Sequence, residues 1–563
     1  MDIEKVLSAP VCIIGTGVAG IISAHVLIQD GFRDVTLISR DQAVGGVWAR
    51  ERVYEGLRTN SVHGEYRFSA LDMKPVNHDM REKDHRLTGE HLCQYMEEYS
   101  QRFLVGKVKF MFHSEVKKLW RDGDGRWLAA VQDTVDGSSQ ELSFARVIVA
   151  SGGNHLPRIP AALSSSSARA SGFEGRLFHS SDFAKEELTL PLPTSNEKRT
   201  LSCVVVGGGK SSQDLAALMT RKGYDVTIVY EQLDVFFASD KPLPDFVRKG
   251  RLLSVLSPHR KLDTKFERFL HKTPVGATLV KTFWKSLVHG STKAYGVPED
   301  SPLRFTPEAF WSIGTNDEGI PRPDGFPALV NQGRLKVVAP FRATGFSEKG
   351  LMITDGRCLA ADVIILATGY ESSWSMLDDE MVEELGLASY KSKEDLKDRW
   401  NYATLRDGPV PHPDRDSWTT SIYRGIVPAK NILHKDFALA GALCTINPGY
   451  TFEVAAHWIS SYFLGDDMRL PATVQEAAAD AEDVINFGKV RFPQTPFWRR
   501  GSGGVTPDTW TWPQAADELL EDMHLRSGRS GGNWLNWAFK AIDVNEISNI
   551  SDERRRLREA RCT

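Results

Sequence analysis

The stretch that decides the fold is Val11-Cys-Ile-Ile-Gly15-Thr-Gly17-Val-Ala-Gly20. Four consecutive apolar residues predict a short buried strand, and the glycines that follow have the spacing of a turn that brings backbone N–H groups close to a pyrophosphate. A helical pattern comes next, and residues 35–38 are a second apolar strand. We therefore expect a strand–helix–strand unit that binds a dinucleotide through Gly15, Gly17 and Gly20.

The same pattern occurs a second time. An apolar strand over 201–206 leads into Gly207-Gly-Gly209-Lys-Ser-Ser212, a helix is expected over 213–222, and a strand over 225–229. One glycine-rich loop can arise simply because a helix packs on a strand, so two loops in the same context are the stronger signal. The repeat predicts a second dinucleotide site at Gly207, Gly209, Ser211 and Ser212, with serine where the third glycine would stand.

Two further strings, Ala145–Gly153 and Asp362–Tyr370, are apolar strands that end in a turn of small residues. We expect each to return to the cofactor, with Thr368 and Gly369 among the binding residues. The two pairs together indicate a flavoprotein that holds FAD in the first unit and a nicotinamide coenzyme in the inserted second unit.

Length and composition bound the class of protein. The chain has 563 residues, 41% hydrophobic and 25% charged, with a formal net charge of -4. This length and composition are those of a globular protein of two or three domains. Basic residues are not in excess, so we do not expect the protein to bind nucleic acid. The six cysteines are scattered, without the spacing of a redox dithiol or a zinc site, so we expect no metal.

The hydrophobic pattern bears on location. The first residues have neither the basic end nor the apolar run of a secretory signal, and no apolar stretch is long enough to span a membrane. We therefore expect a cytoplasmic protein. A helix predicted over 273–288 is expected to pack on its own domain; a substrate lid or a peripheral membrane contact are the alternatives. Its apolar residues recur every fourth position: Val275, Leu279, Phe283 and Leu287.

The expected fold class is α/β, with two Rossmann-like dinucleotide-binding domains, the NAD(P)H domain inserted into the FAD domain, and a C-terminal extension that is mostly helical or irregular. The boundaries follow from where the strand–helix alternation starts, pauses and stops. The expected segments are 1–165 (first part of the FAD domain), 166–345 (NAD(P)H domain with a helical insertion), 346–470 (second part of the FAD domain) and 471–563 (covering extension).

The extension is rich in tryptophan, so it must pack on the rest of the protein. It is expected to cover the nucleotide domains, with a share in the substrate pocket as the alternative. The run Arg554–Arg556 is predicted to be a solvated helix end. The tryptophans are Trp498, Trp510, Trp512, Trp534 and Trp537.

A third motif narrows the class. Phe173-Glu-Gly175-Arg-Leu-Phe-His179-Ser-Ser-Asp-Phe183 matches the pattern F-x-G-x-x-x-H-x-x-x-aromatic. The chain thereby resembles the class B flavin-dependent monooxygenases, the group of the flavin-containing and Baeyer–Villiger monooxygenases. The final Phe183 is closer to the flavin-containing type, and the resemblance implies that His179, counted among the catalytic residues, has a conformational role.

Further stretches agree with this resemblance: Gly45-Gly-Val-Trp48, Leu57-Arg-Thr-Asn60, and Phe437–Gly441 leading to Glu453 and Trp458. The resemblance implies that Gly46 and Trp48 contact the cofactor. It also implies that the Asn60 amide lies beside the flavin and nicotinamide rings and preserves the oxygenated flavin. The alternative is an asparagine that merely caps a loop.

Two positions depart from the usual pattern. An acid that accepts from the FAD ribose is expected about 20 residues after the first glycine loop, but the register points to Ser39. In the second unit Glu231 follows the strand, and an acid there favours the free 2′-hydroxyl of NADH. The resemblance favours NADPH, whose phosphate Lys210, Arg221 or Lys222 could meet, so NADPH is expected with NADH as the alternative.

The resemblance also implies an activity. NAD(P)H would reduce FAD, dioxygen would add as a C4a-hydroperoxide, and one oxygen atom would pass to a small organic substrate by N- or S-oxygenation or hydroxylation, in specialised metabolism. Baeyer–Villiger oxygenation of a ketone is one alternative, and an NAD(P)H oxidase or reductase without oxygen transfer is another. A nucleotide-responsive scaffold that binds partners through the tryptophan-rich tail is a third.

Overall fold

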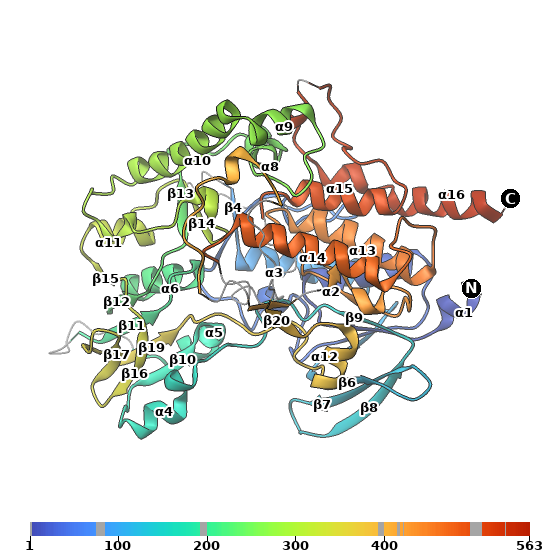
Figure 1. The fold of residues 1–563 in the computed structure, drawn as a ribbon. Helices are drawn as coiled ribbons and strands as arrows, with labels where there is room; N and C mark the ends of the chain where they lie inside the picture. Colours follow the sequence, from blue (N-terminus) through green and yellow to red (C-terminus); the bar gives the residue numbers. More distant parts are fainter. Residues whose placement is uncertain are drawn as a thin grey trace.

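Two parallel sheets of five strands each form the body of the protein, as the computed structural model shows in Figure 1. The expected α/β class, with one Rossmann-like unit inserted into another and a helical C-terminal part, is confirmed. The structure describes residues 3–74, 85–191, 200–391, 399–413, 417–419, 421–495, 509–534 and 536–562.

The first sheet has the strand order β24-β9-β1-β2-β5, and all of its neighbouring strands are parallel. All four residues of β1, β2 and β9 are buried, as expected for continuous apolar strands covered on both faces. Helices α2 (Val18–Gln29) and α13 (Pro448–Leu464) pack on each other. The strands are β1 (Val11–Ile14), β2 (Val35–Ile38), β5 (Lys109–Met111), β9 (Arg146–Val149) and β24 (Phe437–Leu439).

The second sheet has the order β10-β19-β11-β12-β15 and is also parallel throughout. Helix α6 (Lys210–Arg221) follows β11 and begins three residues earlier than predicted. Every strand of this sheet lies between β9 and β24 in the chain, which makes the second unit an insertion. The strands are β10 (Arg176–His179), β11 (Ser202–Val206), β12 (Asp225–Val229), β15 (Leu335–Val338) and β19 (Val363–Leu366).

The expected boundary at residue 345 is wrong in one respect. Strand β19 was assigned to the returning FAD domain, but it pairs with β10 and β11 inside the second sheet. The three-stranded sheet β16 (Ala343–Ser347), β17 (Gly350–Ile353) and β18 (Cys358–Ala360) precedes it. The chain therefore returns to the first sheet after β19, and Thr368 and Gly369 close the second nucleotide loop.

The helical insertion of the second unit contains α7 (Asp245–Arg248), α8 (Leu252–Val255), α9 (Lys265–Lys272) and α10 (Pro274–Ala294). Helices α8, α9 and α10 lie in the upper part of Figure 1. Helix α10 packs on its own domain, as expected, but through Ala277, Val280 and Trp284. Val275 and Leu279, predicted to pack, are 63% and 54% exposed because they lie on the outer side of the helix. Over the described ranges, every helix is too short or too polar to cross a bilayer.

The C-terminal extension adds α14 (Val474–Arg491), α15 (Trp512–Asp522) and α16 (Ile550–Cys562). Trp512 is buried in the core of the first domain, so the extension does cover it, whereas Trp534 is 82% exposed. Trp498 falls outside the described residues.

The prediction of a solvated end at Arg554–Arg556 is wrong for Arg554, which is buried. Its guanidinium lies 2.7 Å from the Asp30 carboxylate at the end of α2 and also donates to the Ser461 hydroxyl. Arg555 and Arg556 are exposed as expected. A buried guanidinium needs a partner that satisfies its charge, and Asp30 supplies it from the opposite end of the sequence.

Candidate active site

One cavity of about 1610 Å³ lies where the glycine loops of the two sheets face each other. Both loops follow the carboxyl ends of parallel strands, the edge at which α/β sheets bind ligands. Most of the residues expected to bind a cofactor or act in catalysis line it: Gly15, Gly17, Ser39, Gly46, Trp48, Asn60, Gly207, Gly209, Ser211, Thr368 and Gly369. Gly20, His179 and Ser212 lie outside its wall.

Each glycine loop crosses the end of the neighbouring strand closely. Gly15 has a φ of +115°, and a Cβ there would lie 2.4 Å from the Ala150 carbonyl oxygen, just after β9. Gly207 has a φ of +131°, and its Cβ would lie 2.5 Å from the Ala367 carbonyl oxygen, just after β19. The two positions require glycine for the same reason, and the strings 145–153 and 362–370 each complete the loop of their own unit.

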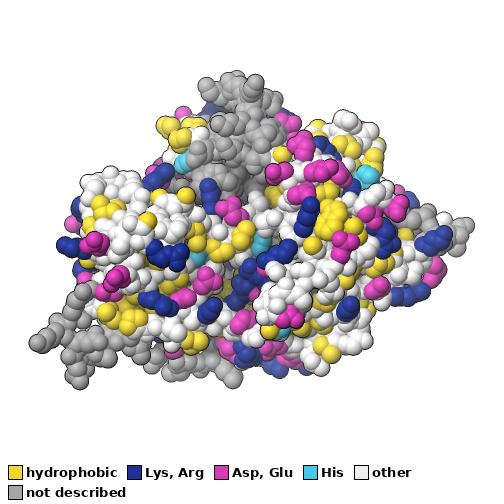
Figure 2. Space-filling model, turned by 90° about the horizontal axis from the view of Figure 1, so that it is seen from below, with side chains coloured by type: hydrophobic (Ala, Val, Ile, Leu, Met, Phe, Trp, Pro, Cys, Tyr) yellow, Lys and Arg dark blue, Asp and Glu magenta, His cyan; other side chains and the backbone are white. Residues whose placement is uncertain are grey.

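The helices behind both loops begin without a capping side chain. Gly17 is the N-cap of α2 and Gly209 is the N-cap of α6, and neither helix has a side chain that accepts from its first turn. The first-turn N–H groups and the positive end of the helix dipole therefore face the cavity, which suits a pyrophosphate. Figure 2 looks into the crevice between the lobes, where basic side chains gather. These features fit two dinucleotides.

Gly20 and Ser212 serve helix packing. A Cβ on Gly20 would lie 2.0 Å from the Gly15 carbonyl oxygen, so glycine lets α2 approach the loop. Ser212 holds the same place in the second unit, fully buried, and its hydroxyl donates to the Gly209 carbonyl at 2.6 Å. The serine in place of the third glycine therefore ties the loop to α6.

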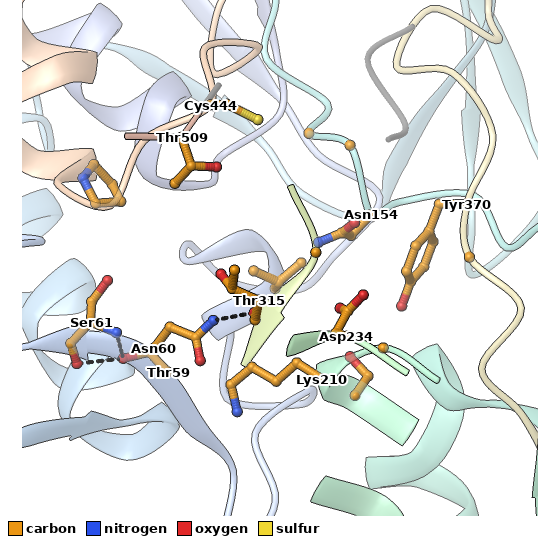
Figure 3. Close-up of a pocket in the computed structure, with 18 of the residues that line it drawn as sticks. Thr59, Asn60, Ser61, Asn154, Lys210, Asp234, Thr315, Tyr370, Cys444 and Thr509 are labelled. Atoms are coloured by element: carbon orange, nitrogen blue, oxygen red, sulfur yellow. Dashed lines mark hydrogen bonds between the residues drawn. The ribbon is translucent and has the colours of Figure 1, made fainter. Parts of the chain in front are cut away.

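Asn60, on β3 (Arg58–Val62), lies between the two units (Figure 3). Its Nδ2 donates to the Thr315 carbonyl at 3.1 Å, and its Oδ1 accepts from the Asp317 N–H at 3.1 Å. Both partners belong to β14 (Thr315–Gly319), a strand of the inserted unit that pairs with β13 (Val235–Ala238). The side chain thus joins two domains instead of capping its own loop, and one Nδ2 hydrogen remains for a ligand.

Ser39 lies at the end of β2, at the position where an acid was expected. Its hydroxyl accepts from the Asp41 N–H at 3.2 Å, and its carbonyl accepts from the Ser114 N–H at 2.8 Å. The Asp41 carboxylate forms an ion pair with the Arg52 guanidinium at 2.6 Å. Glu115, next to Ser114 on β6 (Ser114–Arg121), also lines the cavity, so this neighbouring strand brings a carboxylate to the first site.

His179 ends β10 and is buried beside the connection between the two sheets. Its Nδ1 accepts from the Ser181 N–H, and its ring meets the Tyr370 ring edge to face at 5.2 Å. Burial lowers the pKa of His179, against the opposite effects of Asp182 and of a contact with the Gly369 backbone. His179 contacts Tyr370, which lines the cavity; its conformational role stays a prediction.

Phe183, the last residue of the fingerprint motif, resembles the flavin-containing type in the sequence. In the structure it is fully buried. Its ring packs at 4.7 Å against Tyr54, which lines the cavity, and lies 6.3 Å from Phe178. The residue therefore shapes the core of the second unit and has no direct contact with a substrate.

Large apolar side chains from three separate elements form part of the cavity wall. Phe237 of β13, Leu287 of α10 and Trp510 of the C-terminal extension line it. The Trp510 ring lies 6.0 Å from the Phe237 ring and 5.3 Å from the Trp284 ring, which hold it in place. Gln494, Thr495 and Thr509 line the cavity too, so the extension both covers the first domain and shares in the pocket.

Glu453 and Trp458, noted in the sequence, lie on α13 and are buried. The Trp458 indole donates to Asp522 at 3.1 Å, and the Glu453 carboxylate accepts from the Ser69 N–H at 2.8 Å and from the Ser69 hydroxyl. Burial raises the pKa of Glu453 to about 7, although the Ser69 bonds and Arg67 act in the opposite direction. Both residues thus fasten α13 rather than contact the cavity.

This raised pKa makes stability depend on pH. Folded Glu453 holds its proton more tightly than the unfolded chain does, so the free energy of unfolding should fall by about 3 kcal/mol as pH rises from about 4.5 to 7. A Glu453→Gln variant should lose less stability over this interval, measured by unfolding at pH 5 and pH 8. The exposed Glu174→Gln variant is the control; equal slopes for both variants would contradict the assignment.

A family model, two related sequences and one solved structure are similar to this chain. The family model for pyridine nucleotide-disulphide oxidoreductases matches residues 9–250. "FAD-dependent monooxygenase rstn6" of Aspergillus nomiae is 24% identical over 81% of this chain and 84% of its own. "Probable flavin-containing monooxygenase 1" of Arabidopsis thaliana is 26% identical over 95% of both chains. Cyclohexanone monooxygenase from Rhodococcus sp. Phi1, solved bound to NADP+, has the same fold at a TM-score of 0.56, with 16% identity over 92% of this chain and 98% of that one.

The two facing glycine loops and these relatives define an oxidoreductase with two nucleotide sites. The relatives are similar to this chain over most of its length and support a class B flavin-dependent monooxygenase, the class that the fingerprint motif indicated. The names of the relatives agree with the cofactors expected from the sequence, FAD and NADPH.

Proposed function

We propose that this enzyme uses FAD and NADPH to transfer one oxygen atom from dioxygen to a small organic substrate. The observation that carries the proposal is that both glycine loops open onto one cavity with Asn60 between them. FAD supplies the chemistry with dioxygen, and NADPH supplies the electrons. The first loop, with Gly15 and Gly17, would hold FAD, and the second, with Gly207 and Gly209, would hold NADPH.

The protein's own residues bind, orient and exclude water. The N–H groups at the start of α2 and α6 would hold the two pyrophosphates, and Trp48 and Thr368 would border them. Asn60 would donate its remaining Nδ2 hydrogen to the reacting region, at a position fixed by Thr315 and Asp317. The apolar side chains in the cavity wall would help to exclude water, which strengthens the hydrogen bond of that donor.

The choice of coenzyme would depend on a pair at the end of β12. Glu231 alone would repel the 2′-phosphate of NADPH, but Arg342 lies 2.6 Å from its carboxylate, and both residues line the cavity. The two side chains are about half exposed, so the ion pair is weak and the guanidinium can turn to a phosphate. This arrangement supports NADPH despite the acid.

An Arg342→Gln variant should bind NADP+ about tenfold more weakly than the unchanged enzyme and NAD+ about equally well, because it loses one charge-assisted bond to the phosphate. Titration of the holoenzyme with each coenzyme measures this. Arg357→Gln is the matched control, since Arg357 pairs with Asp355 and lies over the Phe341 ring nearby. An equal loss of affinity for NADP+ and NAD+ would show that Arg342 does not bind the 2′-phosphate.

The reacting atom of the substrate decides between chemistries. Turnover under isotope-labelled dioxygen with a panel of amines, sulfides, alkenes and ketones tests the proposal. Label in an N-oxide, S-oxide or hydroxylated product supports it, whereas label inserted into an ester identifies Baeyer–Villiger oxygenation. NADPH consumption with peroxide as the sole oxygen product for all compounds would identify an oxidase and overturn it.

The proposal also includes the location of the enzyme in the cell. We place the enzyme in the cytoplasm, where NADPH is available as reductant. Val275 and Leu279 of α10 are exposed, and exposed apolar residues on a helix that also carries lysines suit contact with a membrane surface.

A further inference from the structure

Four charged side chains lie together beneath Asn60, and the sequence motifs did not point to any of them. Arg248 comes from α7 in the helical insertion, Asp317 from β14, Glu65 from the turn after β3, and Arg86 from β4 (Arg86–Thr88). Their side chains are at most 20% exposed. The two positive and two negative charges balance, as burial requires. We call this group the Asn60 cluster.

The cluster connects the two domains through Arg248. Its guanidinium lies 2.5 Å from the Asp317 carboxylate and 2.9 Å from the Glu65 carboxylate. Arg86 also pairs with Asp317. Glu65 and Arg86 belong to the first domain, whereas Arg248 and Asp317 belong to the insertion, so the ion pairs cross between them.

The same arginines hold the backbone of Asn60. Its carbonyl oxygen accepts from Nη2 of Arg248 at 2.5 Å and from Arg86. The Asn60 side chain meanwhile bonds to the backbone of Thr315 and Asp317. Backbone and side chain of Asn60 are therefore fixed by the cluster and by β14 at once, which leaves its amide a single orientation toward the cavity.

The Asp317 carboxylate of the cluster stays ionised at neutral pH. Burial alone would raise the pKa of Asp317, but Arg86 and Arg248 together lower it to about 2. A carboxylate with a lowered pKa contributes stability above its unfolded pKa of about 4 and loses it as pH falls toward 2. Asp317 therefore keeps its ion pairs with Arg86 and Arg248 at neutral pH.

We infer that Arg248 is a positioning residue, which aims the Asn60 amide by joining the insertion to β3. The inference rests on the proposed function, because it assigns to Asn60 the role of limiting peroxide release. Arg248 also lines the cavity, and the effect that we assign to it acts through Asn60, whose carbonyl oxygen it binds. Its planar fork reaches Asn60, Glu65 and Asp317 together, and a lysine, with one ammonium group, cannot reproduce that geometry.

The test compares Arg248→Lys with Arg251→Lys in the holoenzyme. Arg251 lies three residues away, is buried to a similar degree, and pairs with Asp517 of α15 at 2.5 Å without contact to Asn60. The measurements are hydrogen exchange of the backbone amides of residues 58–62 and 315–319, and the peroxide released per NADPH oxidised. Asp317→Asn is a further variant, because it weakens the cluster but keeps the backbone N–H that binds Asn60.

We expect Arg248→Lys and Asp317→Asn to speed exchange in both segments and to raise peroxide release about fivefold, the effect of losing roughly one hydrogen bond. Arg251→Lys should do neither. If Arg248→Lys and Arg251→Lys behave alike while the unchanged enzyme transfers oxygen, the inference fails and the proposed function stands. If the unchanged enzyme already releases all its oxygen as peroxide, the proposed function fails instead, and faster exchange alone would show a structural clamp.

Discussion

A Gly17→Val variant is expected to fold but to lose FAD. Gly17 has a φ of -74°, which valine can adopt, and a Cβ there would lie 3.7 Å from the Gly46 Cα, so the chain itself tolerates a side chain. The methyl groups would extend into the cavity beside the loop, where the pyrophosphate should lie. Overpacking of this kind costs about 3 kcal/mol, so FAD should bind roughly a hundredfold more weakly and the purified protein should be colourless.

Two other glycines show whether the effect is specific. Gly123 has open space around its Cβ position in an exposed turn, so Gly123→Val should keep both fold and flavin. Gly15→Val should disturb the fold itself, because its Cβ would meet the Ala150 carbonyl at 2.4 Å. Flavin absorbance and circular dichroism distinguish these cases. A folded Gly17→Val protein that retains its full yellow colour would remove the FAD site from this loop.

The second large effect is expected at Asn60. Asn60→Leu removes the Nδ2 donor that faces the cavity, so NADPH should still reduce the flavin, while peroxide release should rise about tenfold for the lost hydrogen bond. Anaerobic reduction and peroxide yield measure the two effects separately. Similar yields for Asn60→Leu and the unchanged enzyme would make the residue structural.

Leucine also breaks the bonds from Asn60 to β14, so a second variant is needed. Asn60→Asp keeps an oxygen that accepts from the Asp317 N–H, and so keeps one of the two bonds to β14 while the bond to the Thr315 carbonyl is lost. It lacks the donor. If Asn60→Asp leaks as much peroxide as Asn60→Leu, the donor matters; if it restores coupling, the link between the domains is the important contribution.

Local patterns explain which parts of the fold could be predicted. The strands Val11–Ile14, Val35–Ile38 and Asp225–Val229 have their predicted bounds because apolar runs and glycine turns act over a few residues. The string 362–370 looks the same in sequence whichever sheet it joins. Its place beside β11 depends on long-range pairing, and the domain boundary was therefore wrong.

The candidate site, too, could be predicted only where local sequence motifs form it. The glycine loops and Asn60 stand in recognisable motifs, but the partner of Asn60 on β14 lies 257 residues away. Arg248 and Glu65 are ordinary charged residues in the sequence, and Arg554 was expected in solvent because its partner, Asp30, is 524 residues distant. Burial and charge pairing across such separations depend on the packed fold, which one sequence does not display.

The central claim is that the enzyme retains oxygen from dioxygen for transfer. Rapid mixing of the anaerobically NADPH-reduced holoenzyme with dioxygen, while oxygen uptake, flavin absorbance and peroxide are followed, tests it most directly. We expect oxygen uptake to be complete well before oxidised flavin returns, and peroxide to appear with the slow phase. Oxidised flavin and peroxide that appear as fast as oxygen is consumed, whichever substrate is added, would contradict it.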